Sequence, residues 1–431
     1  MNKITVSWNQ ELQPIDGFGV CGAFMQARNL QTYPEADRQK ILDALFSRTT
    51  GAGVSMIRNI VGDSGTWGNE EDGPTPSIMP RRGERSETGD EDQIWFMKEA
   101  ARRGCDRFIS SVWSPPAWMK TTGDVTHGGE LKPECYADFA DYIVQYIRLY
   151  GDRHGLPIYA LSPSNEPDYT ATYSSCLWTA AQFYEFYHSH LGPAFKRAGV
   201  STLTFGPETM FFGNVVLRRY AGMFKGRRGL PEIAAMHGYG ESVIEPLDRA
   251  IIGDRKIWMS ELCEIDHPMN TGCDPSMEDG LRVARNIHRY LADAGANAYI
   301  YFWGMSKYDN NSALVRLDLE KRSYTLCKRL YTFGQFSRFI RPGFVRIGVK
   351  HDCGDGVLIS AYKGEGGKLA VVAVNLGESA CACKLEGAGF NLPRLLQYVT
   401  DQTRDLALTG AAAPGGKVTL PARSVSTFAA E

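Results

Sequence analysis

The chain of 431 residues is about three times as long as a common single domain, so two domains, or one large domain with an addition, are expected. Apolar residues make up 43% and charged residues 22%, a composition that disfavours a disordered chain. The 47 basic and 49 acidic residues leave a net charge of −2, which disfavours a nucleic-acid or polyanion binder.

The cysteines and the N-terminus add information about the compartment. Ten cysteines are scattered along the chain without a CxxC pair, so a disulfide scaffold is not expected. No apolar signal-peptide segment is visible at the N-terminus, which predicts a cytoplasmic protein or a secreted one whose signal has been removed. No apolar stretch approaches the ~20 residues that cross a bilayer, so we expect no membrane partner, and we expect a monomer.

Short apolar runs alternate with amphipathic runs from the N-terminus to about Pro342. Eight of the short runs have the length and composition of strands: 15–20, 56–60, 107–113, 158–162, 202–206, 233–237, 256–261 and 298–303. Between some of them, apolar residues recur at three- and four-residue steps, as in 136–150, 178–195 and 280–294. Eight strand–helix units predict an α/β fold, a (β/α)8 TIM barrel over residues 15–340, with a doubly wound open sheet as the competing layout.

The pattern changes after Pro342. Short alternating runs at 357–362, 369–374, 417–420 and 424–428 are separated by Gly-rich turns rather than by helices. Such hairpins predict an attached β-sandwich side domain. The N-terminal strand at 4–8 needs a partner for its backbone groups, and joining this sheet would supply one. The predicted side domain therefore comprises residues 1–14 plus 341–431.

Two of the predicted strands end in a glutamate, at the carboxyl edge where a barrel of this kind places its chemistry. The fourth strand continues into Asn165-Glu166-Pro167, and the seventh ends in Ser260-Glu261. Two facing carboxyl groups are the minimum apparatus for glycoside hydrolysis. One protonates the leaving oxygen, and the other attacks the anomeric carbon or activates water.

Aromatic side chains occur at other strand ends. The third strand leads into Trp113, two prolines and Trp118, and indole rings held in this way suit the C–H faces of sugar rings. The sixth strand ends in His237-Gly238-Tyr239, where a tyrosine hydroxyl could hydrogen-bond a nucleophilic carboxylate and keep it ionised. Packing roles for Trp113 and Trp118, and a buried core role for His237, are the alternatives.

Cysteines near Glu261 raise the question of a metal. Cys263, His267 and Cys273 offer three ligands at irregular spacing, whereas a tetrahedral zinc site needs a fourth ligand or a water. We therefore expect no metal site.

Together these motifs resemble glycoside hydrolase family 30, in the clan of retaining (β/α)8 glycosidases. The shared segments are 15–19, 55–58, 113–116, 165–167, 260–261, 333–343 and 360–363, so the resemblance covers nearly the whole chain. It implies a barrel with a side sandwich that includes the N-terminal strand. It also implies a reaction that needs no metal and no organic cofactor.

The resemblance implies that Glu166 is the general acid/base and Glu261 the nucleophile. It implies that Asn165 binds the sugar 2-hydroxyl, and that the −1 subsite is lined by Arg58, Trp113, His237 and Tyr239. The family's aromatic platform after the eighth strand maps to Tyr301, Phe302 or Trp303, of which Trp303 is the candidate carried forward. Glu208, which closes the fifth strand, ranks below Glu261 because it lacks the match at the nucleophile position.

The resemblance favours a neutral β-linked glycan as partner. Members acting on xylan match these motifs best, which predicts cleavage of β-1,4-xylosidic bonds in xylan, glucuronoxylan or xylooligosaccharides. Endo-β-1,6-galactanase or β-1,6-glucanase activity is the alternative, and a non-catalytic carbohydrate-binding protein is the alternative outside the enzymes. The arginine that clamps glucuronate in some members is replaced here by Lys307, a weaker and non-bidentate group, which counts against strict glucuronate dependence.

Overall fold

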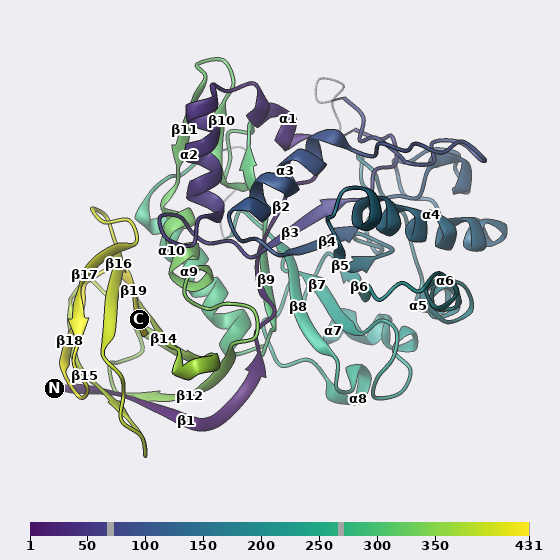
Figure 1. Cartoon of the computed structure of the whole chain (residues 1–431). Coiled ribbons are helices and arrows are strands. Elements are labelled where there is room, and N and C mark those ends of the chain that lie inside the picture. The colour runs from purple at the N-terminus through teal and green to yellow at the C-terminus, as the bar shows by residue number, and fades with distance from the viewer. Residues whose placement is uncertain (67–72, 266–270, 431) are drawn as a thin grey trace.

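The computed structural model describes residues 1–66, 73–265 and 271–430, and its first sheet closes into a barrel (Figure 1). Eight parallel strands follow one another around the barrel, and the last pairs with both the seventh and the first. They are β2 (Gly17–Cys21), β3 (Met56–Ile60), β4 (Arg107–Ser111), β5 (Ile158–Ser162), β6 (Leu203–Thr209), β7 (Ile233–His237), β8 (Lys256–Leu262) and β9 (Ala298–Ser306). The predicted barrel is confirmed, and the doubly wound alternative is wrong.

Alternation along the strands explains why these segments close around an apolar interior. Met56, Ile109, Ala160, Phe205 and Trp258 come from five different strands and pack into one buried cluster. The intervening residues point outward and join the larger core between the strands and the helices. The buried Asp16, just before β2, accepts from Nε1 of Trp258 at 2.9 Å, at the end of the barrel where the strands begin.

The helices of the barrel include one helix close to each of the predicted ranges 136–150 and 280–294. They are α1 (Gln26–Gln31), α2 (Glu35–Phe46), α3 (Glu91–Arg102), α4 (Tyr136–Arg148), α5 (Ala180–Glu185), α6 (Gly192–Ala198), α7 (Asn214–Arg219), α8 (Arg249–Ile252), α9 (Met277–Ala292) and α10 (Lys328–Ser337). The segment predicted as one helix over 178–195 is divided by a π-helix at Phe186–Leu191. Pro193, just beyond it, has no backbone N–H to donate, and the turn before it is wider than an α-turn.

A short antiparallel pair extends the barrel sheet beyond β9, and the sequence analysis does not anticipate it. β10 (Ala313–Asp318) runs parallel to β9 and antiparallel to β11 (Ser323–Leu326). The chain then enters α10, so these strands fill the connection that follows the eighth barrel strand.

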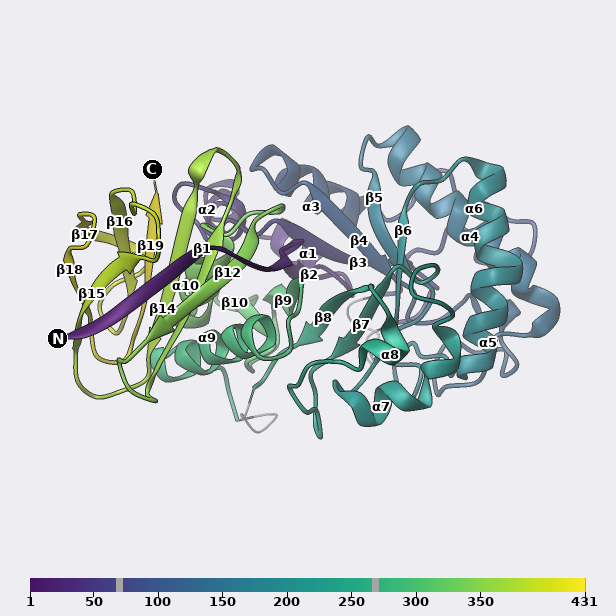
Figure 2. The same cartoon turned by 90° about the horizontal axis from the view of Figure 1, so that it is seen from below.

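The remaining strands form a second sheet of nine strands (Figures 1 and 2). They are β1 (Asn2–Pro14), β12 (Val345–His351), β13 (Val357–Lys363), β14 (Leu369–Asn375), β15 (Cys381–Gly387), β16 (Leu395–Thr400), β17 (Ala407–Ala412), β18 (Lys417–Leu420) and β19 (Ser424–Ala430). β1 pairs with β12 antiparallel and with β15 parallel, which confirms that the N-terminal strand joins the C-terminal sheet.

The second sheet has its own core and also packs on the barrel. Along β14, Val371 and Ala373 point into the core that the sandwich encloses, whereas Val372 and Val374 join the main core. Helices α9 and α10 lie between this sheet and the barrel strands (Figure 2). Through these two helices the sandwich packs on the side of the barrel formed by β9 and β2. Among the described residues, no helix is long and apolar enough to cross a membrane.

Candidate active site

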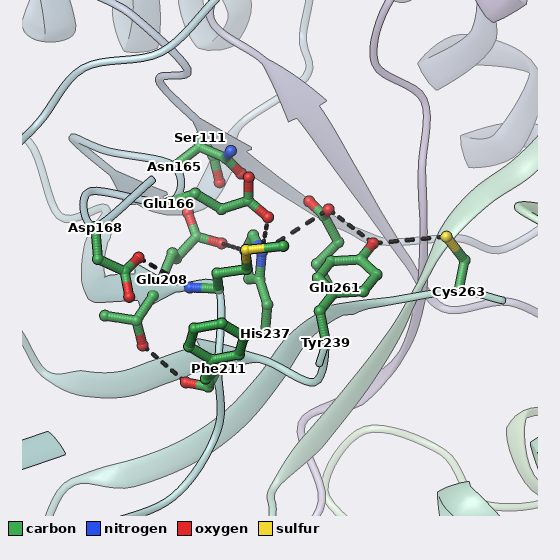
Figure 3. Close-up of polar contacts among 12 residues, drawn as sticks. Ser111, Asn165, Glu166, Asp168, Glu208, Phe211, His237, Tyr239, Glu261 and Cys263 are labelled. Carbon is green, nitrogen blue, oxygen red and sulfur yellow. Dashed lines mark hydrogen bonds and ion pairs between the residues drawn. The ribbon is translucent and has the colours of Figure 1, made fainter. Parts of the chain in front are cut away.

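Glu166 and Glu261 meet at the carboxyl ends of the barrel strands (Figure 3). A carboxylate oxygen of each, and a ring nitrogen of His237, all lie within 4.8 Å of one another. Both glutamates are buried, with about 4% of their surface exposed. Two carboxyl groups at this separation fit the retaining class of glycosidase, in which they lie ~5–5.5 Å apart, rather than the inverting class, in which they lie ~6.5–9.5 Å apart.

Two irregular strand registers turn glutamates into the barrel. Glu261 lies three residues after the inward-pointing Trp258, and Glu208 lies three residues after the inward-pointing Phe205, so strict alternation would point both outward. In each case one extra residue is inserted relative to β7, between Met259 and Glu261 on β8 and between Pro207 and Thr209 on β6. Such bulges re-aim a side chain, and here both carboxyl groups reach the barrel axis.

Glu166 sits on the loop that follows β5, in a left-handed backbone conformation with φ of 45°. Its N–H donates to the backbone oxygen of Glu208 at 2.9 Å, and Glu208 is itself left-handed, with φ of 60°. Non-glycine residues adopt this conformation at a cost of about 1–3 kcal/mol, which the surrounding structure must offset. The carboxyl group is held from two sides: Oε1 contacts His237 Nδ1 at 3.1 Å, and Oε2 accepts from Tyr173 Oη at 3.1 Å.

Arg58, on β3, contacts two of the carboxyl groups, those of Glu208 and Glu261. Its fully buried guanidinium donates through Nη1 to Glu261 Oε2 at 2.5 Å and through Nη2 to Asn165 Oδ1 at 2.7 Å. Its Nε donates to Glu208 Oε1 at 3.1 Å and to Ser111 Oγ at 3.0 Å. Burial opposes its charge, but the Glu208 and Glu261 carboxylates hold the pKa of Arg58 above its usual range. The site thus contains a permanent cation.

His237 supplies a second cation. Burial alone would lower its pKa, but Glu261, Glu166 and Glu208 around it raise the pKa to about 10. Glu208 is fully buried, which opposes its charge, yet Arg58 and His237 keep the pKa of Glu208 below its usual value. Burial raises the pKa of Glu261, against the opposing pull of His237 and Arg58. Two cations and three carboxyl groups make a cluster that is neutral when it carries one carboxyl proton.

This charge balance decides what the cluster can do. Because Glu166 and Glu261 are so close, the two carboxyl groups are not readily ionised together. The pair therefore shares one proton, with one carboxyl group protonated and its neighbour ionised. Arg58 never loses its charge and contacts Glu261 rather than Glu166, which favours the ionised form of Glu261. Arg58 and His237 already balance the two ionised carboxylates, which leaves a divalent cation little uncompensated charge to bind.

Tyr239 holds Glu261 from the other side. Its hydroxyl donates to Glu261 Oε1 at 3.0 Å and lies 3.6 Å from the sulfur of Cys263. Figure 3 shows the hydroxyl between these two groups. Burial raises the pKa of Tyr239 well above its usual value, so its hydroxyl is protonated and a donor at neutral pH. The hydrogen bond predicted between a tyrosine after β7 and the carboxylate on β8 is therefore present.

The two tryptophans expected to contact sugar are both buried. Trp113 is 1% exposed, with the Arg58 guanidinium 4.4 Å from its ring centroid and Phe24 against its edge. Trp303 is 2% exposed, stacks between Phe302 and Tyr308, and donates from Nε1 to Ala23 O at 3.1 Å. This burial argues against open stacking surfaces. The ring of Trp113 supports Arg58 instead, and the face of Trp303 is covered by its own neighbours.

Several contacts were missed by the sequence analysis. Tyr173 lies in the loop after β5 with no motif around it, and only the folded loop brings its hydroxyl to Glu166. Ser111 could have been found, since it ends β4 beside the strand that carries Arg58. Glu208 was considered only as a rival nucleophile, whereas the structure places it beneath Arg58 and His237.

Two of the three residues considered as zinc ligands, Cys263 and Cys273, have other contacts. Cys263 contacts Tyr239, while the sulfur of Cys273 lies 3.6 Å from that of Cys327 and accepts from Arg329 Nη2 at 3.2 Å. His267, the third residue of that hypothesis, lies outside the described residues. The two cysteines thus have different partners.

A cavity of about 610 Å³ opens beside the carboxyl pair. Its wall shares Tyr239 and Cys263 with the site, and Ile244, Leu262, Arg285 and Tyr290 complete much of the lining. Pockets of this size hold small ligands in many proteins. Tyr239 therefore separates the carboxyl pair from a space large enough for a sugar residue.

Comparisons with known proteins find similarity to enzymes that hydrolyse glycosidic bonds. A family model described as glycosyl hydrolase family 59 matches residues 15–191, a segment that contains Glu166 but not Glu261. The glucuronoxylanase XynC of Bacillus subtilis (strain 168) is 25% identical over 356 residues, which are 78% of this chain and 76% of that protein. An endo-1,6-beta-D-glucanase of Neurospora crassa is 24% identical over 357 residues, which are 77% of this chain and 72% of that protein.

A solved structure matches along nearly the whole chain. The catalytic domain of the family 30 xylanase C from Talaromyces cellulolyticus superposes with a TM-score of 0.81 at 27% identity. The match covers 99% of each chain, so it includes the barrel and the sandwich together.

Proposed function

We propose that this chain, which is a clan A glycoside hydrolase of the family 30 type, cleaves β-1,4-xylosidic bonds in xylan, glucuronoxylan or xylooligosaccharides by double displacement. The observation that carries the mechanism is the approach of the Glu166 and Glu261 oxygens to within 4.8 Å. The substrate is supported by the two xylanases to which the chain is similar.

In the first step, a Glu261 carboxylate oxygen attacks the anomeric carbon while the bond to the leaving sugar oxygen breaks. Glu166 gives its proton to that oxygen. Arg58 and Tyr239 hold Glu261 in place, one on each carboxylate oxygen, so the nucleophile needs little reorganisation to react. The product is a glycosyl ester of Glu261 and a released sugar with a free hydroxyl.

In the second step, water attacks the anomeric carbon and the ester bond to Glu261 breaks. Glu166, ionised after the first step, takes the proton from the water. His237 and Tyr173 donate to the two oxygens of Glu166 and fix the carboxyl group in its loop, so the same group can serve as acid and then as base. Two inversions at one carbon retain the β configuration.

Cleavage of β-1,6-glucan is the second candidate, because the Neurospora crassa glucanase aligns over nearly the same share of the chain as XynC does. Strict glucuronate dependence is not part of the proposal. The Lys307 ammonium lies 5.7 Å from the centroid of the Tyr308 ring, and a lysine cannot clamp a carboxylate in the bidentate way of arginine.

Product analysis on linear xylooligosaccharides, glucuronoxylan, β-1,6-galactan and β-1,6-glucan tests the substrate. We expect shortened products from both xylan substrates, with kcat/KM on the linear chain within about tenfold of that on glucuronoxylan, since one lost contact in a partly exposed subsite is worth about 1.4 kcal/mol. Activity on a β-1,6-linked glycan with none on either xylan substrate would replace the xylan proposal by the second candidate.

A further inference from the structure

Glu208 is the one carboxyl group of the cluster for which the double displacement has no use. It is fully buried beneath the catalytic pair, and its Oε1 lies 3.0 Å from Arg58 Nη2 and 3.5 Å from His237 Nε2. The same two cations also contact the reacting carboxyl groups: Arg58 contacts Glu261, and His237 contacts Glu166. A buried charge that joins both cations influences both reacting groups through them.

We propose that Glu208 is a positioning residue, the fixed anion that holds Arg58 and His237 as cations against Glu261 and Glu166 and so keeps one proton on the catalytic pair. This inference rests on the proposed function, because it assigns Glu208 a part in the same site.

The charge count supports the role. With Glu208 ionised, the charges of Arg58 and His237 are balanced by Glu208 and by one carboxylate of the catalytic pair, so the pair carries one proton. Without the charge of Glu208, the cluster gains a net positive charge. That charge favours ionisation of both Glu166 and Glu261, so the proton needed for the first step is lost at a lower pH.

A backbone hydrogen bond also connects Glu208 with Glu166. The oxygen of Glu208 accepts the N–H of Glu166 at 2.9 Å, and both residues have a left-handed backbone. The bulge on β6 that turns Glu208 inward therefore also fixes the loop that carries the acid/base. Residue 208 thus controls where Glu166 stands as well as which charges surround it.

The titratable and charged groups that face Glu208 and His237 come from every neighbouring element. Around Glu208 and His237 they are Arg58 from β3, Ser111 from β4, Glu166 and Asp168 from the loop after β5, Tyr187 from the π-helix, Tyr239 after β7 and Glu261 from β8. Burial and Arg58 act on Glu208 most strongly, so its own carboxyl stays ionised while the pair above it titrates.

Glu208→Gln tests this, because the amide keeps the shape of the side chain and removes the charge. We expect both limbs of the kcat/KM–pH profile on an aryl β-xyloside to move to lower pH by about one unit, the size of shift that one close charge produces. The shift alone should lower the rate at the wild-type optimum by up to about fivefold. A profile that keeps the wild-type limbs, with a uniformly lower rate, would mean that Glu208 only supports the fold.

The matched control is Asp279→Asn on α9, another buried carboxylate that binds an arginine, with Asp279 Oδ2 2.7 Å from Arg329 Nη1. It should lower the melting temperature but leave both limbs of the profile in place. A shift of the limbs in this variant equal to that of Glu208→Gln would show that any buried charge has the same effect, and would overturn the proposal.

One further measurement does not depend on whether a variant at position 208 folds. In the wild-type protein labelled with ¹⁵N at histidine, the His237 ring should stay doubly protonated up to a pKa of about 10, and it is identified by its absence from spectra of His237→Gln. A His237 that titrates near 6.5 would overturn the inference. This readout does not depend on turnover, so it remains decisive even if no β-glycoside is hydrolysed, the result that would defeat the proposed function.

Discussion

Replacing Glu261 with alanine is expected to lower kcat by about 10⁴-fold or more on every β-glycoside that the wild type cleaves. In the proposed mechanism this carboxylate forms the covalent intermediate, and removal of a catalytic nucleophile costs about 10⁴–10⁶ in other enzymes. The measurement is kcat on an aryl β-xyloside and on xylooligosaccharides. Ligand binding, followed by calorimetry, should remain detectable because Glu166, Asn165 and Tyr173 are left in place.

This variant also separates an enzyme from a carbohydrate-binding protein. Added azide can enter the space left by the carboxylate and attack the anomeric carbon directly, which gives a glycosyl azide of inverted configuration. The exposed Glu241, in the loop after β7, is the control, and Glu241→Ala should change kcat by less than about twofold. If Glu261→Ala retains more than about a hundredth of the wild-type rate, another group is the nucleophile.

Replacing Glu166 with alanine should produce a loss that depends on the leaving group. On xylooligosaccharides, whose leaving oxygen needs a proton, kcat/KM should fall by about 10³–10⁴, at the upper end of the usual worth of general acid catalysis. On a dinitrophenyl β-xyloside, which departs without help, kcat/KM should fall much less. The water step loses its base for both substrates, so the glycosyl enzyme accumulates, and kcat and KM fall together.

Azide distinguishes the two glutamates. In Glu166→Ala it replaces water in the second step, because its attack needs no base, and the product should be a glycosyl azide of retained configuration. Tyr173→Phe is the matched control for the surroundings of Glu166, since it removes one hydrogen bond to Oε2 and leaves the acid. Equal losses on both substrates in Glu166→Ala would contradict its role as the acid.

The barrel and the positions of both glutamates could be predicted because they depend on local patterns. Apolar runs of five to seven residues mark the strands, and Asn165-Glu166-Pro167 and Ser260-Glu261 stand where those runs end. The direction of the side chains could not be predicted in this way. Glu261 lies at an odd step from Trp258, and only the extra residue of β8 relative to β7 turns it inward.

The roles of buried groups were the least predictable part. Trp113 follows a strand as a sugar-binding indole would, but Arg58 covers its ring, a contact between residues 55 positions apart. Glu208 is separated from Arg58 by 150 positions and from His237 by 29, so its partners are known only once the barrel closes. Electrostatic partners of this kind are set by topology rather than by spacing.

The central claim is that Glu166 and Glu261 act as a retaining pair. Proton NMR of the wild-type enzyme acting on a β-xyloside tests it most directly, because the anomeric signal of the first-formed sugar is read before mutarotation. A separation within 4.8 Å predicts that the β-anomer appears first and the α-anomer grows later. An α-anomer that appears first would show inversion by a water held between the carboxyl groups, and would contradict the geometry described for this site.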